Sequence, residues 1–474
     1  MDYTFTYPRE KFEAGQLTST EIKKLIGKHE SLMVDELTKK DAYYKGEHEI
    51  QNRTREAGAP NEKAVCNHAK DISDTASGYF MGNPITWIYK GEAEDGAQPL
   101  YELMDYAEVN DTDQENALIL SIQGRGYEYI YLEEGEPMLK TKSLDPKNTF
   151  MVCDQSIEHR ELFGVYYYYK KDDTSDKEET KCYITVSTAE KLMEYVLESN
   201  EDVPPVNETE NVLGFIQIIE YKNNKFCIGD FEQQIGLIDA YNTLMSDRVN
   251  DKEQFVDNIL VLYGAILGDN AEETAEAQKQ LKQRKLLELD EDARAEYLKN
   301  TLDETGAEVL RQALKQDIYT FSHVPNLSDE NFAGNSSGVA MEYKLLGLEM
   351  LTKIKERWYR RGLRKRLKIF LRVLEIKGVV IPEAEVEAKF SRGLPKNNLE
   401  IAQIVATLAG TVSQRTLLSQ IPFVENPDAE IEALDAEREK NMLNQMQMMT
   451  AQSMLPPDDE GGEPEEEEEE IDEQ

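Results

Sequence analysis

Histidine and cysteine are scarce in this chain of 474 residues, which contains five of the first and four of the second. The cysteines, Cys66, Cys153, Cys182 and Cys227, are isolated and far apart, which favours reduced thiols over a disulfide framework or a zinc knuckle. The histidines also occur singly, so no HExxH helix is present. We therefore expect no metal site and no other cofactor.

Local catalytic signatures are missing as well. The sequence has no GxxxxGKS/T phosphate loop, no GxSxG elbow and no paired CxxC motif. Gly124-Arg125-Gly126 resembles part of a glycine-rich phosphate loop, but it precedes a predicted strand instead of opening a helix. A turn between helix and strand is the better interpretation. The sequence predicts a protein that is not an enzyme.

A long hydrophobic run is also absent. The longest, ILVLYGAIL at 259–267, is about half of the ~20 residues that a membrane-spanning helix needs. The first 15 residues lack the basic start, apolar run and small-residue cleavage site of a secretory signal. We expect no membrane association and synthesis in the cytoplasm.

Positive charge is in short supply: 53 Lys and Arg residues stand against 93 Asp and Glu, a formal net charge of −40. This excess argues against a protein that coats duplex DNA by neutralising phosphates. Residues 458–474 hold 12 acidic and no basic residues, and without them the charge is still −28. Because runs of like charge usually stay solvated, we predict a disordered tail there. The rest has enough apolar material for two or three folded units.

Helical periodicity dominates what the sequence does contain. Between 127 and 221 the pattern changes to short alternating runs separated by turn residues, which predicts a mostly antiparallel sheet. The predicted fold class is therefore α+β, mainly helical. Apolar residues at helical spacing predict helices over 18–46, 61–80, 98–122, 230–257, 303–323 and 337–377.

Two of these helices, 230–257 and 303–323, flank a stretch in which strand-like runs surround a charged helical segment. This order predicts a small α/β insertion over 258–302, carried by two helices. A loop rich in Asn, Ser and Gly follows at 325–338, and its composition keeps the backbone mobile.

A basic cluster lies within the long helix that starts near residue 337. Glu356 is its one local counter-charge in the sequence, so its other partners must come from elsewhere. We favour carboxylates of this chain or of an adjacent subunit over DNA phosphate, because the chain is so acidic, and both alternatives stay open. The residues assigned to this subunit-interface or DNA-facing cluster are Arg357, Arg360, Arg361, Arg364, Lys365 and Arg366.

The order of these parts resembles the portal proteins of tailed bacteriophages, in particular those of long-tailed phages of Gram-positive bacteria. The resemblance covers most of the chain, and its specificity lies in the order of the segments, since none is a catalytic signature. The segments are Tyr43-Tyr44-Lys45-Gly46, Asn67-His68-Ala69-Lys70, Gly78-Tyr79-Phe80-Met81-Gly82-Asn83-Pro84-Ile85, Ser337-Gly338-Val339-Ala340-Met341, Arg360-Arg361-Gly362-Leu363 and Leu417-Leu418-Ser419-Gln420-Ile421-Pro422-Phe423-Val424.

The resemblance implies a ring of about 12 subunits at one capsid vertex, with a central channel for double-stranded DNA. It also implies a portal-like architecture in which the sheet lies in a wing that the long helix crosses. The implied parts are the wing at 1–229, the stem at 230–257 and 303–324, the clip at 258–302, the tunnel loop at 325–338, the long wing helix and return strand at 339–395, the crown at 396–457 and the acidic tail at 458–474.

Partners and location also follow from the resemblance. It implies contacts with the terminase large subunit, a head-completion or adaptor protein, and the major capsid and scaffolding proteins, in a virion assembled in the host cytoplasm. The alternative is a non-enzymatic capsid scaffold or interior head protein. That alternative explains the acidity and the long helices, but not the paired helices around an α/β insertion.

Polar side chains of the implied tunnel loop are our candidates for contact with DNA. An acidic channel with polar loop contacts suits a DNA rod that has to slide, because it avoids tight binding. A linker without DNA contact is the competing interpretation. The candidates are Asn326, Asn331, Asn335, Ser336 and Ser337, with Lys315 and Lys344 as charged contacts.

Overall fold

A computed structural model gives two compact units, Met1–Leu394 and Pro395–Gln474. Each unit is described by itself. The described residues are 4–57, 59–91, 96–133, 138–171, 180–197, 202–256, 260–263, 270–284, 294–297, 304–327, 338–392 and, between 403 and 442, short runs and single residues of which 405–419 is the longest.

The larger sheet of the first unit has six strands in the order β1-β5-β6-β7-β8-β9, and only the β1–β5 pair is parallel. Its core joins Phe150 and Val165 of the sheet to Ile22 and Ile26 of a helix. The strands are β1 (Phe5–Thr6), β5 (Thr149–Cys153), β6 (Glu161–Lys171), β7 (Thr180–Thr188), β8 (Lys191–Leu197) and β9 (Asn207–Glu210).

A second, three-stranded sheet has the order β10-β3-β4 and is antiparallel throughout. The predicted antiparallel strands over 127–221 are thus present, but they divide between two sheets, because alternation reveals a strand without revealing which strand it pairs with. The strands are β3 (Arg125–Leu132), β4 (Leu139–Leu144) and β10 (Ile218–Lys222). A separate antiparallel pair joins β2 (Thr86–Tyr89) to β13 (Val386–Lys389).

The predicted helix over 18–46 is confirmed, with its ends where the capping residues lie. The Thr18 side chain accepts a hydrogen bond from the Glu21 N–H at 3.3 Å, and Gly46 ends the helix at φ 88°, a left-handed conformation that favours glycine. The helix consists of α2 (Ser19–His29), a π-helical turn (Glu30–Val34) and α3 (Asp35–Lys45), and a short helix, α1 (Arg9–Glu13), precedes it.

The prediction of a helix over 61–80 was wrong at its start, because α4 spans His68–Met81. Asn67 caps α4 by accepting a hydrogen bond from the Lys70 N–H at 3.0 Å. The residues before it form an irregular segment whose N–H groups are used elsewhere. The N–H groups of Glu62, Ala64 and Cys66 donate to side chains of another helix, so they are not free to start a helix of their own.

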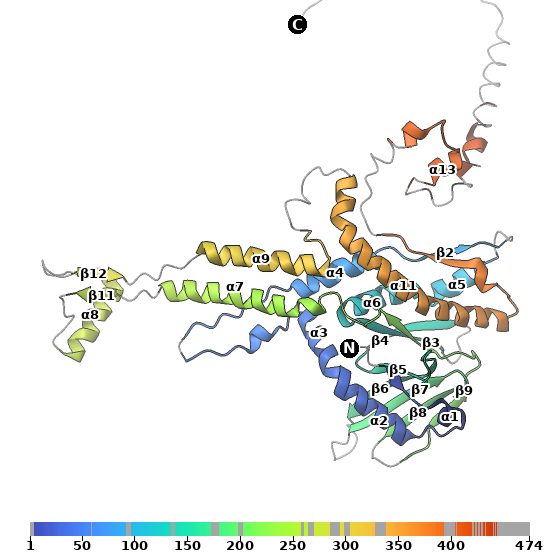
Figure 1. Ribbon diagram of the computed structural model, residues 1–474, viewed down its shortest axis with the longest axis horizontal. Helices are drawn as coiled ribbons and strands as arrows, with labels where there is room; N and C mark the ends of the chain where they lie inside the picture. Colours follow the sequence, from blue (N-terminus) through green and yellow to red (C-terminus); the bar gives the residue numbers. More distant parts are fainter. Residues whose placement is uncertain are drawn as a thin grey trace, which may run out of the picture. The chain divides into compact units, whose positions relative to one another are not determined.

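That other helix is α7 (Ile235–Val256), which lies beside α9 (Glu304–Ser322) in Figure 1. Arg248 joins the two helices through ion pairs with Glu304 and Glu308, both at 2.9 Å. Between them in sequence come β11 (Leu260–Tyr263), α8 (Ala271–Arg284) and β12 (Arg294–Tyr297), and β11 pairs with β12 in antiparallel fashion. The predicted strand-helix-strand insertion between two paired helices is therefore present.

The predicted helix over 98–122 is two helices, α5 (Gln98–Tyr106) and α6 (Val109–Gln123), because Glu108 between them has a φ of 51°. The long helix, α11 (Gly338–Ile376), is continuous over 39 residues and packs on β10. Gly362 allows this close approach, since a Cβ there would lie 2.3 Å from the Tyr221 ring.

In the second unit, α13 (Gln414–Leu418) begins at Ser413, whose side chain accepts a hydrogen bond from the Thr416 N–H at 3.4 Å. No helix in the described part of the chain combines the length and the apolar character that a membrane crossing requires.

Candidate nucleic-acid interface

A cavity of about 720 Å³ lies where the end of α9 meets the beginning of α11. Lys315 comes from the α9 side, Asn326 from the chain just after that helix, and Lys344 from the first turns of α11. The full lining is Arg311, Gln312, Lys315, Gln316, Tyr319, Thr320, His323, Val324, Pro325, Asn326, Lys344 and Gly347. Basic, amide and hydroxyl groups therefore face this space, and none of the described residues that line it is a carboxylate.

Arg311 is fixed at one end of the cavity. Its guanidinium donates to both Glu308 oxygens, at 2.6 and 3.0 Å, and to the Tyr241 hydroxyl at 3.2 Å. The hydrogen bonds from Arg311 and Arg248 lower the pKa of Glu308 to about 2, and the same contacts raise the pKa of Arg311 above its ordinary value. Arg311 thus stays charged and oriented.

Tyr319 closes the wall behind the cavity. Its hydroxyl lies 2.6 Å from an Asp71 carboxylate oxygen, to which it donates, and 3.3 Å from Nδ1 of His68. Burial raises the pKa of Tyr319 above its ordinary value, and the hydrogen bond to Asp71 adds to this effect. Burial also lowers the pKa of His68, with a further contribution from the charge of Lys315.

Of the predicted DNA contacts, the structure brings Lys315, Asn326 and Lys344 together around this one cavity. The other four, Asn331, Asn335, Ser336 and Ser337, lie outside the described residues. The cations Arg311, Lys315 and Lys344, together with the amide and hydroxyl groups of the lining, can bind the oxygen atoms of an anion.

Sequence reasoning missed the remaining polar residues of the lining. Gln312, Gln316 and Thr320 follow each other at intervals of four along α9, and Arg311 and Lys315 run beside them. Residues four apart lie on one helix face, so a search for polar residues at this spacing before the loop would have found them.

The predicted basic cluster on α11 does not act as one group. Arg366 is fully buried and makes a two-point contact with Asp113, at 2.6 and 2.9 Å, and a contact with Glu128 at 2.9 Å. The Tyr221 hydroxyl donates to Glu128 at 2.6 Å, and the Tyr359 hydroxyl donates to Asp113. Burial raises the pKa of Glu128, and the charge of Arg366 opposes that rise.

Two more members of the cluster contact groups of the same chain. Arg360 pairs with Glu356 at 2.7 Å and donates to the Ala388 carbonyl at 2.7 Å. Lys365 pairs with Glu161 at 2.5 Å. The other three members, Arg357, Arg361 and Arg364, are exposed, and Arg361 stacks on the Trp358 ring with 4.0 Å between its guanidinium carbon and the ring centre.

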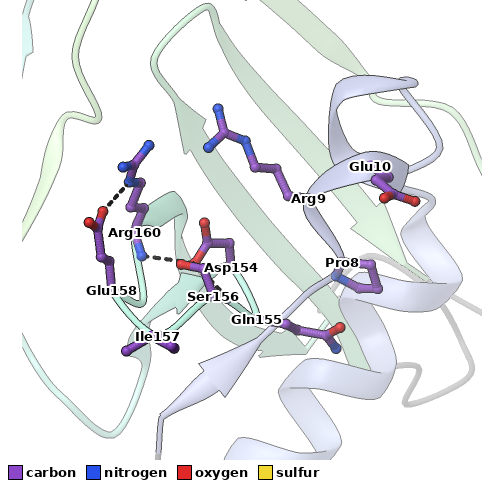
Figure 2. Close-up of a pocket in the computed structure, with 9 residues that line it drawn as sticks. All are labelled: Pro8, Arg9, Glu10, Asp154, Gln155, Ser156, Ile157, Glu158 and Arg160. Atoms are coloured by element: carbon purple, nitrogen blue, oxygen red, sulfur yellow. Dashed lines mark hydrogen bonds and ion pairs between the residues drawn. The ribbon is translucent and has the colours of Figure 1, made fainter.

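A second cavity, of about 630 Å³, lies between α1 and the turn at 154–160 (Figure 2). Asp154 holds this turn by accepting hydrogen bonds from the Ser156 N–H at 3.1 Å and the Arg160 N–H at 3.0 Å. Arg160 pairs with Glu158 at 2.6 Å. Because three carboxylates and two arginines share the lining, this cavity has no preference for an anion.

No group of three or more His, Cys, Asp or Glu side chains suited to a metal ion occurs within the described ranges. The α9–α11 cavity is therefore the strongest candidate for ligand binding, and its chemistry is that of anion binding.

Comparisons with known proteins agree on one family. Residues 23–442 match the model of a family described as "Phage portal protein, SPP1 Gp6-like". The chain is 24% identical over 464 residues to the portal protein of Bacillus phage SPP1, across 92% of this chain and 89% of that protein. It is 27% identical over 230 residues to the portal protein of Clostridium phage phiCD119, across 48% and 49% of the two chains.

One solved structure, titled "Neck of empty GTA particle computed with C6 symmetry", aligns with a TM-score of 0.45 at 10% identity, across 74% of this chain and 89% of the other.

Proposed function

This chain belongs to the family of SPP1 Gp6-like phage portal proteins, and we propose that about 12 copies form a ring whose channel conducts double-stranded DNA. The ring sits at one vertex of the virion capsid, where it serves genome packaging and later ejection. It acts as a structural channel and not as an enzyme. The family match over residues 23–442 is the observation that carries the proposal.

In this proposal the parts keep the roles that the sequence implied. Helices α7 and α9 form the stem, residues 258–302 the clip, 325–338 the tunnel loop and 396–457 the crown. The clip meets the terminase large subunit and then a head-completion or adaptor protein. The remaining surfaces meet the major capsid and scaffolding proteins, and assembly takes place in the host cytoplasm.

The α9–α11 cavity is the DNA-contacting part of the channel wall in this proposal. The basic and amide groups among the described lining residues support this role, because phosphate oxygens need such donors. The overall charge of −40 limits the strength of binding, so the DNA can slide. Lys315 and Lys344 contact phosphates through charge, and Asn326 contacts them through its amide.

Negative-stain electron microscopy with mass photometry tests the ring. We expect closed particles of about a dozen subunits with a central hole. Purified protein that stays monomeric or dimeric, alone and with a scaffolding partner, would contradict the proposed function.

The salt dependence of DNA binding tests the cavity. In the double variant Lys315→Gln and Lys344→Gln, the slope of log affinity against log salt should become shallower by ~0.9 for each phosphate that is no longer neutralised. Fluorescence anisotropy with a short duplex measures this slope. Lys24→Gln with Lys377→Gln removes two exposed lysines elsewhere and serves as the matched control. Equal slopes for both double variants would show that the cavity lysines do not contact the DNA.

A further inference from the structure

One face of α11 carries large apolar side chains that the subunit does not bury. Tyr343, Leu346, Met350 and Ile354 are 74%, 52%, 61% and 49% exposed. They follow each other at three- and four-residue intervals, so they form a single stripe. The core-facing side of the same helix already packs through Leu345, Leu348, Tyr359 and other buried residues, so this stripe is not needed for folding. Contiguous exposed apolar surface of this kind marks an interface with another macromolecule.

The same face continues with positive charge. Arg357, Arg361 and Arg364 extend the stripe at the same helical spacing, and all three are exposed. Within the described part of the chain, none of them lies within ion-pair distance of a carboxylate, although other basic residues of α11 do. The partner of this face must therefore offer both apolar surface and negative charge.

The chain itself has a surface of that kind at the junction of α5 and α6. Glu108, Asp111 and Glu115 are exposed there and lie beside a hollow of about 330 Å³ whose lining includes the Tyr106 and Tyr131 rings. Lys142 and Lys140 line the hollow too, and Lys140 pairs with Glu133. No ion pair of these three carboxylates occurs among the described residues, so the hollow keeps an excess of negative charge.

The acidic and basic faces point away from each other within one subunit. Arg366 of α11 contacts Asp113 of α6, so these two side chains point toward each other. Residues two apart on a helix lie about 200° apart around its axis. Arg364 is two residues from Arg366, and Asp111 and Glu115 are two residues from Asp113. The two charged faces therefore point away from each other across the Arg366–Asp113 contact.

We propose that the α11 face of one copy docks on the acidic α5–α6 face of the next copy, as a head-to-tail interface that repeats around the ring. Two different, complementary surfaces on opposite sides are what a closed ring of identical subunits requires. This inference rests on the proposed ring. A second copy fits better than DNA because four large apolar side chains belong to the same stripe, and a phosphate backbone gives them no partner.

Charge reversal and charge exchange test the interface. The chain with Arg361→Glu and Arg364→Glu should lose the ring in mass photometry at a concentration where the unchanged protein is fully assembled, since like charges then face each other. The chain with Asp111→Lys and Glu115→Lys should also lose it. Combining all four changes in one chain exchanges the signs and should restore the ring. The four positions are exposed, so folding is expected to persist.

A matched control is Lys24→Glu with Lys377→Glu, which reverses two exposed lysines outside the α11 face. It should keep the ring. Loss of the ring in both reversals without recovery in the four-fold exchange would overturn the docking. A ring that survives the arginine reversal while DNA binding weakens would assign these arginines to DNA and overturn it as well. If the unchanged protein forms no ring, the proposed function itself fails, which is a different result.

Discussion

Two buried polar attachments hold the first unit together, and they use different chemistry. At α7 the groups are neutral: side-chain amides and a hydroxyl accept hydrogen bonds from backbone N–H groups. At α11 the groups are charged: Lys355 pairs with Asp230, and Arg366 pairs with Asp113 and Glu128. The protein thus holds an irregular connection with neutral hydrogen bonds and a long helix with buried ion pairs.

The neutral attachment binds residues 61–67, which we call the strap. Asn242, Ser246 and Asn250 lie one turn apart along α7, and all three are fully buried. They accept from the N–H groups of Cys66 at 2.8 Å, Ala64 at 3.0 Å and Glu62 at 2.6 Å. Alternate residues of the strap thus match successive turns of the helix, and Figure 1 shows the segment between α3 and α4 running along α7.

The charged attachment behaves differently when it is disturbed. Breaking one neutral hydrogen bond leaves one N–H without an acceptor, whereas removing the cation leaves two carboxylates buried without their partner. Arg366, Asp113 and Glu128 are each no more than 2% exposed. We therefore expect the hydrogen bonds of the strap to break one at a time. The ion pairs of α11 should instead be lost together.

Replacing the central cation should have the largest effect. Arg366→Met should lower the free energy of unfolding by about 3–5 kcal/mol, because both carboxylates stay buried without their partner. Denaturant unfolding measures this change. Lys24→Met, at an exposed position of α2, is the control and should change stability by no more than about 0.5 kcal/mol. Similar values for both would show that burial of Arg366 has no energetic consequence.

Removing one hydrogen bond of the strap should have a smaller and local effect. Asn242→Ala leaves the Cys66 N–H without an acceptor, which costs about 1–3 kcal/mol. Hydrogen exchange should be faster at Glu62, Ala64 and Cys66 than in the rest of the unit. Thr243→Ala, at an exposed position next along α7, should leave these amides unchanged. Uniformly faster exchange throughout the unit would argue against a separable strap.

These two attachments also show what the sequence could predict of the fold. Helical spacing and capping located the helix from Thr18 to Gly46 and both paired helices, since such signals are local. The strap was predicted as helix because its partners on α7 lie more than 170 residues away in sequence. Asn242, Ser246 and Asn250 were visible as a polar row at four-residue spacing, but such a row is usually a solvated face.

The candidate site was predictable to a similar extent. The resemblance to portal proteins led to Lys315, Asn326 and Lys344 as candidates, and these three residues share one cavity. The basic cluster of α11 was found as a set, but its members look alike in sequence. Arg364 and Arg366 lie two residues apart, so a helix points their side chains to opposite sides. Which of the two is buried depends on Asp113 of another helix, and the local sequence does not show that partner.

The smallest expected effect is a difference in how the stability contributed by each attachment depends on pH. Burial raises the pKa of Glu128 above its ordinary value of 4.5, so the folded state holds that proton more tightly than the unfolded state does. The stability from this group is complete below pH 4.5 and decreases as pH rises through the folded pKa. Glu128→Gln keeps an acceptor for Tyr221 and Arg366 but does not titrate.

The stability of Glu128→Gln relative to the unchanged protein should therefore improve steadily as pH is raised from 4.5 through the folded pKa. Denaturant unfolding at several pH values measures the difference. Ser246→Ala, which removes a neutral hydrogen bond of the strap, should show a constant difference over the same range, since neither Ser246 nor the Ala64 N–H titrates. A constant difference for Glu128→Gln as well would mean that the carboxylate stays ionised in both states, held so by Arg366 in spite of its burial.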